Sequence, residues 1–259
     1  MDQVLKDNPS HSRSDVVVLI DADNTLWDTN AVYVAARQCL LDEIRSALGT
    51  QVCVQVRSRD LHAIDEAIYR LHKKRYLYPP RFLARAVALV LIGEDVQSAA
   101  KKSLRGSKVE SELMSESEIA KRYTRSIEFS TPHLRRGVKT GMRLLRKSSC
   151  QRIVLTEGSV RRVQRLLDHY GFSVCVNHVQ SLNKSREAFD DLSRSFGDRG
   201  AQLYIIGDSL ERDIAPAKAA SIRTVHFPGG FRPAQRCNVV PDYTINSFLA
   251  GVKIINFRE

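Results

Sequence analysis

The sequence predicts an α/β protein with a Rossmann-like parallel sheet core, helices on both faces of that sheet, and an inserted α-helical domain. A buried strand lies near the N-terminus, about a hundred residues with helical periodicity follow, and strands then alternate with helices. Alternating strands and helices form a parallel sheet covered on both faces. We therefore expect the core at 15–30 and 131–259, the helical insert at 31–130, and a polar tail at 1–14.

The composition is that of a globular protein. Of the 259 residues, 43% are hydrophobic and 27% are charged, which excludes a disordered or fibrous chain. A membrane-spanning helix needs about 18 consecutive apolar residues, and no uncharged apolar run approaches that length. We therefore expect no membrane association, and the polar N-terminus lacks the apolar core of a signal peptide.

The cysteine content and the net charge limit the compartments and the partners that we expect. The five cysteines are odd in number and include no CxxC pair, which argues against a disulfide framework and against a thiolate zinc site. This favours the reducing cytoplasm. The net charge of +11 favours anionic partners, which range from phosphorylated metabolites to nucleic acid.

The first predicted strand leads directly into an acidic loop. Asp15–Ile20 is a continuous, β-branched apolar run, typical of a central strand buried on both faces. An acidic cluster at Asp21–Asp28 follows at once. Carboxylates have no place inside a sheet, so this cluster should lie at the carboxyl end of the strand, where open α/β sheets bind ligands.

The next hundred residues show helical spacing. Leu40, Leu41, Ile44 and Leu48 lie on one helical face, and similar patterns recur further along the insert. Two prolines at 79 and 80 break one segment and are suited to begin the next. The polar stretch Gln97–Ser117 is expected to be a loop.

The second half predicts the rest of the sheet. Strands are expected at Arg152–Leu155, Ser173–Val176, Leu203–Ile206, Arg223–Phe227 and Tyr243–Ile245, with helices at Gly137–Lys147, Val160–Tyr170, Arg186–Phe196 and Arg212–Ala220. Parallel strands end at one edge, so polar residues that follow them should converge. Those residues are Asp21 and Asp23, Thr156, Lys184, and Asp208 with Asp213. Carboxylate oxygens suit Mg²⁺, and a hydroxyl with a lysine suits an anionic oxygen.

Four ordered motifs make the chain resemble the haloacid dehalogenase (HAD) superfamily of phosphohydrolases. They are Asp21-Ala-Asp23-Asn-Thr25 for D-x-D-x-[TV], Thr156-Glu157-Gly158 at the end of a strand, Lys184 ahead of a helix, and Gly207-Asp208-Ser-Leu-Glu-Arg-Asp213 for G-D-x-x-x-x-D. The resemblance covers 15–30 and about 132–245.

This resemblance implies a mechanism and assigns catalytic roles to four residues. Asp21 would be the nucleophile that forms an aspartyl-phosphate. Asp23 would be the general acid for the leaving group and then the base for water. Thr156 and Lys184 would hold phosphate oxygens. The dehalogenase reaction is disfavoured, because that branch of the family lacks the second aspartate.

The resemblance also implies a Mg²⁺ site. The side chains of Asp21 and Asp208 and the carbonyl of Asp23 would be its ligands. Asp213 would orient Lys184 or a metal-bound water, and Gly158 and Ser209 would support these loops. Glu157 departs from the family pattern, because an extra carboxylate near a phosphate is unfavourable unless it points away or meets an arginine. The proline that often follows the family's lysine is also absent.

The helical insert has the sequence position of the family's C1 cap, which implies a small phosphorylated substrate. Trp27, Arg81 and Arg85 could contact the substrate. The alternatives are that Trp27 is a packing residue and that the two arginines belong to a solvated helix face.

We therefore predict a Mg²⁺-dependent phosphatase that acts on a small phosphorylated metabolite or nucleotide. A phosphatase acting on polynucleotide ends is the alternative, and a phosphomutase or a non-catalytic binding module are further ones. The polynucleotide alternative depends on basic residues that could track a phosphate backbone, and nucleic acid remains a less favoured partner. Those residues are Arg135, Lys139, Arg143, Arg146, Lys147, Arg161, Arg162 and Arg165. The sequence does not predict the oligomeric state.

Overall fold

The chain forms two compact units in the computed structural model. The described residues are 16–57, 60–72, 78–106, 115–198, 200–229 and 237–256. One unit comprises the residues up to Asp28 together with those from His133 onward, and the other is Thr29–Pro132. The predicted tail at 1–14 lies outside the described residues.

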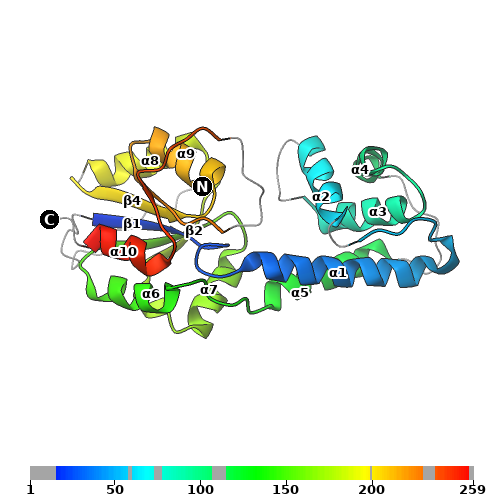
Figure 1. The fold of residues 1–259 in the computed structure, drawn as a ribbon, viewed down its shortest axis with the longest axis horizontal. Helices are drawn as coiled ribbons and strands as arrows, with labels where there is room; N and C mark the ends of the chain where they lie inside the picture. The colour runs from blue at the N-terminus through cyan, green and yellow to red at the C-terminus, as the bar shows by residue number, and fades with distance from the viewer. Residues whose placement is uncertain are drawn as a thin grey trace. The chain divides into compact units, whose positions relative to one another are not determined.

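The first unit is built on a parallel sheet (Figure 1). Within the described residues its strand order is β3-β2-β1-β4-β5-β6, and every pairing is parallel. The strands are β1 Val16–Asp21, β2 Gln151–Thr156, β3 His178–Ser181, β4 Gln202–Gly207, β5 Arg223–His226 and β6 Tyr243–Thr244. In register, Asp21 lies beside Leu155, and Ile20 beside Ile206. The ends of β1, β2 and β4 therefore share one edge.

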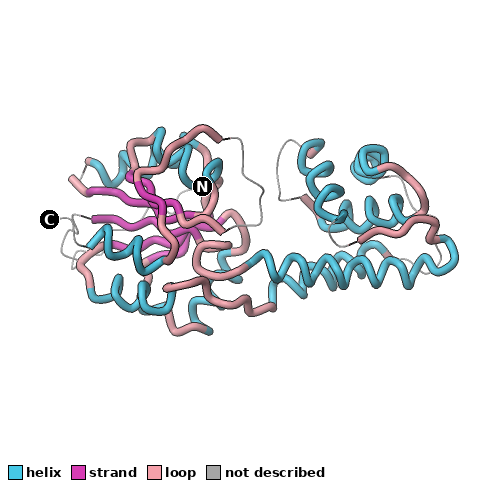
Figure 2. Tube along the Cα trace, viewed as in Figure 1, coloured by secondary structure: helices cyan, strands magenta, loops and turns pink. Residues whose placement is uncertain are grey.

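Helices cover both faces of the sheet, as Figure 2 shows. Val18 and Ile20 of β1 belong to the apolar cluster formed with α6 (Val138–Lys147), α7 (Val160–His169) and α10 (Phe248–Asn256). Val17 and Leu19 point to the opposite face, with α8 (Arg186–Gly197) and α9 (Ala215–Ala219). These four side chains are at most 1% exposed, and each contributes about 1.5–3 kcal/mol on burial. The period-2 alternation of a strand thus anchors β1 between two layers.

The second unit is helical and has a separate apolar core. Its helices are α1 Thr29–Leu48, α2 Asp60–Leu71, α3 Pro80–Leu91, α4 Val96–Arg105 and α5 Glu116–Phe129. Pro80 begins α3, as the sequence indicates. The side chain of Asp95 caps α4 by accepting hydrogen bonds from two amides, and Gly106 ends that helix in the left-handed conformation.

The predicted fold class is confirmed, with three local corrections. Ser173–Val176 is not a strand, because Ser173–Cys175 is a 3₁₀ turn and the strand follows at His178. The predicted helix Arg212–Ala220 starts as a π-helical turn at Leu210–Ile214 and continues as α9. The expected loop at Gln97–Ser117 is wrong at both ends, because its start belongs to α4 and its last two residues belong to α5, whereas 107–114 lie outside the described residues.

Ser173–Val176 is not a strand for a simple physical reason. Val174 is 63% exposed, whereas Cys175 is buried in the core cluster that α6 and α7 share. Only Cys175 of this segment is fully buried, because a turn packs it against the core, and no strand runs through the segment. Among the helices of the described ranges, none combines the length and the apolarity that a bilayer span requires.

Candidate active site

Turns that begin with a capping serine follow β2, β3 and β4 at the carboxyl edge of the sheet. Ser159, Ser185 and Ser209 each accept a hydrogen bond from the amide three residues further on. Each serine thereby begins a helix or helical turn directly after a predicted motif. The amides of these first turns are suited to bind anions.

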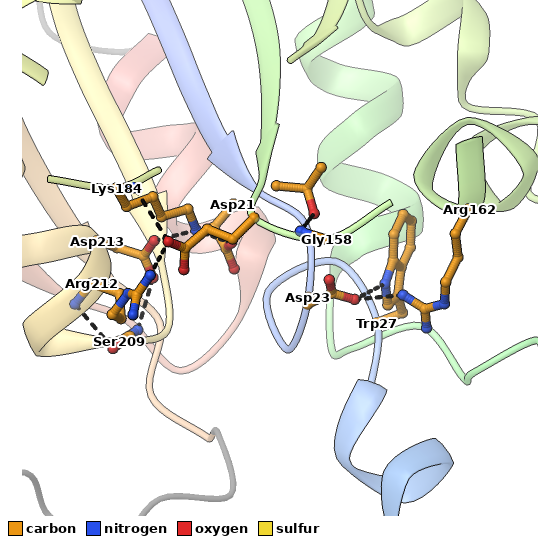
Figure 3. Close-up of polar contacts among 11 residues, drawn as sticks. Asp21, Asp23, Trp27, Gly158, Arg162, Lys184, Ser209, Arg212 and Asp213 are labelled. Carbon is orange, nitrogen blue, oxygen red and sulfur yellow. Dashed lines mark hydrogen bonds and ion pairs between the residues drawn. The ribbon is translucent and has the colours of Figure 1, made fainter. Parts of the chain in front are cut away.

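A buried lysine bridges two buried aspartates beyond the end of β1 (Figure 3). Nζ of Lys184 donates to Oδ1 of Asp21 and, at 2.6 Å, to Oδ1 of Asp213. The three side chains are 4%, 6% and 1% exposed, respectively. The other oxygen of Asp213 accepts from the Ser209 amide at 3.0 Å. Asp213 is therefore satisfied on both oxygens and holds Lys184 against Asp21.

Burial sets the electrostatics of this trio. Burial raises the pKa of Asp21 well above its ordinary value, and repulsion by Asp213 and Asp208 adds to the rise, while Lys184 opposes it. Burial by itself would lower the pKa of Lys184, but attraction to Asp21 and Asp213 raises it. Lys184 is therefore charged, and further positive charge beside Asp21 would favour the carboxylate form of that side chain.

The same place is suited to a divalent cation. Carboxylate oxygens of Asp21, Asp208 and Asp213 lie within 4.8 Å of one another, a cluster found by searching the described residues. Oδ2 of Asp21 is buried and has no hydrogen-bond partner. An orphaned carboxylate oxygen inside a protein is unfavourable without a cation. Hard oxygen donors of this kind fit Mg²⁺.

Asp23 points away from this cluster and contacts different residues (Figure 3). Its Oδ1 accepts from Nη1 of Arg162 at 2.8 Å and from Nε1 of Trp27 at 3.2 Å. The Asp23 side chain is 32% exposed, whereas that of Arg162 is 6% exposed. The Trp27 side chain is fully buried, which favours the alternative that it is a packing residue, and its contact with substrate stays a prediction. Trp27 therefore contacts the predicted acid/base and has no exposed surface of its own.

The loop after β2, which contains Gly158, lies between Asp21 and Asp23 (Figure 3). Thr156 is buried, and its Oγ1 accepts from the Gly158 amide at 3.0 Å. A β-carbon on Gly158 would lie 3.5 Å from this oxygen and 3.7 Å from Oδ2 of Asp23. The predicted phosphate-binding hydroxyl of Thr156 is thus near the carboxylate of Asp23, the predicted acid/base.

Glu157 meets an arginine, as the sequence required. It forms an ion pair with Arg212 of the π-helical turn, and its Oε1 also accepts from the Lys184 amide at 3.2 Å. The extra carboxylate therefore links the loops that follow β2, β3 and β4. Its charge is compensated, and it holds the backbone of the predicted catalytic lysine.

The two arginines predicted as substrate contacts belong to the helical unit. Arg85 is held by Glu116, with Nε donating to both carboxylate oxygens at 2.9 and 3.0 Å. Arg81 lies over the ring of Phe82, at 5.4 Å from its centroid. Their proposed role in substrate binding remains a prediction.

Two of the basic residues predicted to track a phosphate backbone make contacts within the sheet-containing unit. Arg135 donates to the carbonyls of Phe227 and Pro228 at 3.0 and 2.6 Å and stacks on the Phe227 ring. Arg162 is buried against Asp23. Arg162 is therefore not exposed to a phosphate backbone, and the polynucleotide alternative stays a prediction.

The sequence reasoning missed the roles of Arg162 and Arg212 in the site. One signal was available for Arg162, which lies in the first turn of a helix. A cation there faces the positive end of the helix dipole. An arginine at that position and on the buried face indicates an acidic partner.

The chain matches the family model of the haloacid dehalogenase-like hydrolases over residues 16–221. It is similar to the magnesium-bound HAD-hydrolase YfnB of Bacillus subtilis, with 16% identity, a TM-score of 0.64, and 93% of this chain and 99% of that chain covered. A predicted phosphoglycolate phosphatase of Haemophilus somnus has 17% identity and a TM-score of 0.54, covering 94% and 98%. A 2-haloacid dehalogenase of Pseudomonas syringae has 18% identity and a TM-score of 0.53, covering 92% and 98%. No curated protein matches the chain.

Proposed function

The chain belongs to the haloacid dehalogenase-like hydrolases, and on that premise we propose that it is a Mg²⁺-dependent phosphatase. It hydrolyses a small phosphorylated metabolite or nucleotide through an aspartyl-phosphate. The observation that carries this proposal is the pair Asp21 and Asp23, two residues apart at the end of β1 and held by different cations. A phosphatase needs both a nucleophile and a separate acid/base, whereas a dehalogenase has no leaving oxygen to protonate.

The first half of the reaction uses both aspartates. A carboxylate oxygen of Asp21 attacks phosphorus while Lys184 and Thr156 hold the phosphoryl oxygens. The bond from phosphorus to the leaving oxygen breaks, and Asp23 gives that oxygen a proton. Lys184 stays in place because Asp213 and the Glu157-held backbone fix it from two sides.

The second half regenerates the enzyme. Asp23, now a carboxylate, takes a proton from the attacking water as the water oxygen bonds to phosphorus. The bond between phosphorus and Asp21 breaks and returns the nucleophile. Asp21 and Asp208 would hold Mg²⁺ with the Asp23 carbonyl, and the ion would supply positive charge for the carboxylates and the phosphoryl oxygens.

The substrate class is argued from the helical unit. Thr29–Pro132 is inserted between the first two motifs, which is the sequence position of a C1 cap in this family. Caps exclude water and favour small substrates over folded phosphoproteins. The fold neighbours that are described as phosphatases support this class.

Phosphate release tests the proposal directly. Purified protein is assayed with Mg²⁺ against nucleoside monophosphates, sugar phosphates, phosphoglycolate and phosphorylated oligonucleotides, and halide release is assayed with 2-haloacids. We expect phosphate release from a small substrate that disappears with chelator and in Asp21→Asn. Halide release, or no phosphate from folded protein that binds Mg²⁺, would contradict the proposal. Isomerised sugar phosphate in place of free phosphate would identify a mutase.

A further inference from the structure

Arg162 is a buried cation in an unfavourable place. It lies in the first turn of α7, three residues after the N-cap residue Ser159, and is 5% exposed. The partial positive charge of a helix N-terminus repels a guanidinium, and burial of a charge is unfavourable unless the charge is paired. Asp23 supplies the opposite charge that such a site requires.

Two donors meet at one oxygen of Asp23. Arg162 Nη1 and Trp27 Nε1 both donate to Oδ1. The planar guanidinium is rigid, and Trp27 is fully buried, so both donors restrict how the carboxylate can turn. Oδ2 lies on the side of the loop after β2, where a β-carbon on Gly158 would be 3.7 Å from it.

We propose that Arg162 positions Asp23 for proton transfer by holding Oδ1, so that Oδ2 faces the leaving oxygen of the substrate. This inference rests on the proposed function. When the phosphorus–oxygen bond breaks, the leaving oxygen keeps the electron pair and takes the proton from Oδ2. Asp23 becomes a carboxylate that is paired with Arg162, and it recovers a proton from water in the second half of the reaction.

The loss of rate on removing Arg162 should depend on the leaving group of the substrate. A 4-nitrophenolate leaves without protonation, whereas an alkoxide needs a proton as its bond breaks. General acid catalysis contributes about 10²–10⁴-fold to rate. Loss of Arg162 should therefore slow alkyl phosphates strongly and 4-nitrophenyl phosphate weakly. A group that binds phosphate would affect both substrates equally.

The test compares three substrates and three variants. The substrates are 4-nitrophenyl phosphate, phenyl phosphate and glycerol 2-phosphate, in order of rising leaving-group basicity. The variants are Arg162→Met, Arg162→Lys, and the matched control Arg161→Met, which changes an exposed neighbour on the same helix. Each is checked for folding by thermal unfolding, and kcat and KM are measured at saturating Mg²⁺.

We expect Arg162→Met to lower kcat for glycerol 2-phosphate by on the order of 10²-fold, with a much smaller loss for 4-nitrophenyl phosphate and little change in KM. Arg162→Lys keeps the charge without the planar fork and should fall between Arg162→Met and wild type. Arg161→Met should match wild type. In Asp23→Asn, the further change Arg162→Met should add almost nothing to the loss on glycerol 2-phosphate, because the positioned acid is already absent.

The failing outcomes differ from one another. Equal loss on all three substrates, or a change in KM alone, would overturn the positioning role while leaving the phosphatase intact. If Arg162→Met does not fold, Arg162→Lys decides by the same comparison. If wild-type protein releases phosphate from none of the three substrates or from the panel above, the proposed function falls and the positioning role falls with it.

Discussion

Lys184→Met removes a buried cation from between two buried carboxylates, and we predict that it lowers the free energy of unfolding by about 3–5 kcal/mol. Lys184 Nζ lies 2.6 Å from Asp213 and also contacts Asp21. All three side chains are at most 6% exposed, so water screens them little. Methionine has a similar length, and the loss should therefore report charge more than volume.

The magnitude follows from opposing contributions. At an effective dielectric constant of about 20, two unit charges attract by ~4 kcal/mol even when they lie about 4 Å apart, and Lys184 makes two contacts that are closer than this. Burying the ammonium offsets several kcal/mol of this attraction. Protonation of a carboxyl limits the loss further, since burial already raises the pKa of Asp21. The expected loss in the free energy of unfolding is therefore about 3–5 kcal/mol, which is typical when one partner of a buried ion pair is removed.

Urea unfolding at pH 7 in chelator measures the effect. Lys218→Met is the matched control, because Lys218 pairs with Asp242 at the surface with side chains 41% and 35% exposed, and such pairs contribute about 0–1 kcal/mol. Adding Asp213→Asn to Lys184→Met should cost about 0.5–3 kcal/mol less than the sum of the single changes. Mg²⁺ should restore part of the loss. A Lys184→Met variant within about 1 kcal/mol of wild type would refute the reasoning.

Three further predictions concern stability and geometry. Burial raises the pKa of Asp242, but the hydrogen bond from Lys218 and the hydrogen bonds from the buried Thr224 outweigh burial and lower this pKa to about 2. The resulting stabilisation is present above the unfolded pKa and is lost as pH falls from about 5 toward 2. Since the carboxylate is about one-third exposed, Asp242→Asn should cost only about 1 kcal/mol at pH 7 in urea titrations, with the gap closing in acid. Gly207→Ala would place a β-carbon 2.4 Å from Asp213, so phosphatase activity should fall far more than the melting temperature; unchanged kcat would contradict this. Gly141→Ala gains about 1 kcal/mol of helix propensity but meets the ring of Phe248 at 2.6 Å, so calorimetry should show net destabilisation by about 1–2 kcal/mol.

Central elements could be predicted from sequence because their environment is simple. β1 is buried on both faces, so nearly every residue had to be apolar, and the run predicted the strand within one residue at each end. The edge strand β3 could not be found in this way. Its residues His178–Ser181 are mostly exposed, so no apolar pattern marks them, while the turn before it is apolar for a local packing reason.

The same contrast holds within the site. The convergence of Asp21, Thr156 and Asp208 follows from topology, because parallel strands end together. The pairing of Arg162 with Asp23 spans 139 positions and depends on how α7 is rotated against the loop after β1. Periodicity gives a helix face only approximately, and an arginine is long enough to reach solvent from many positions. Its partner therefore needed the structure.

The charges of the site argue for a divalent cation independently of any motif. Among the described side chains, Lys184, Arg162 and Arg212 are paired with four carboxylates, those of Asp21, Asp213, Asp23 and Glu157. Asp208 adds a fifth carboxylate to the cluster around Asp21. When all are ionised, the carboxylates outnumber the nearby cations Lys184, Arg162, Arg212 and Arg135, the last of which interacts electrostatically with Asp208 and Asp21. A phosphate ester would bring further negative charge into the same place. A divalent cation would add positive charge beside Asp21, the more buried of the two aspartates proposed to react. Asp23, one-third exposed and paired with its own arginine, stays close to the water from which it must recover a proton.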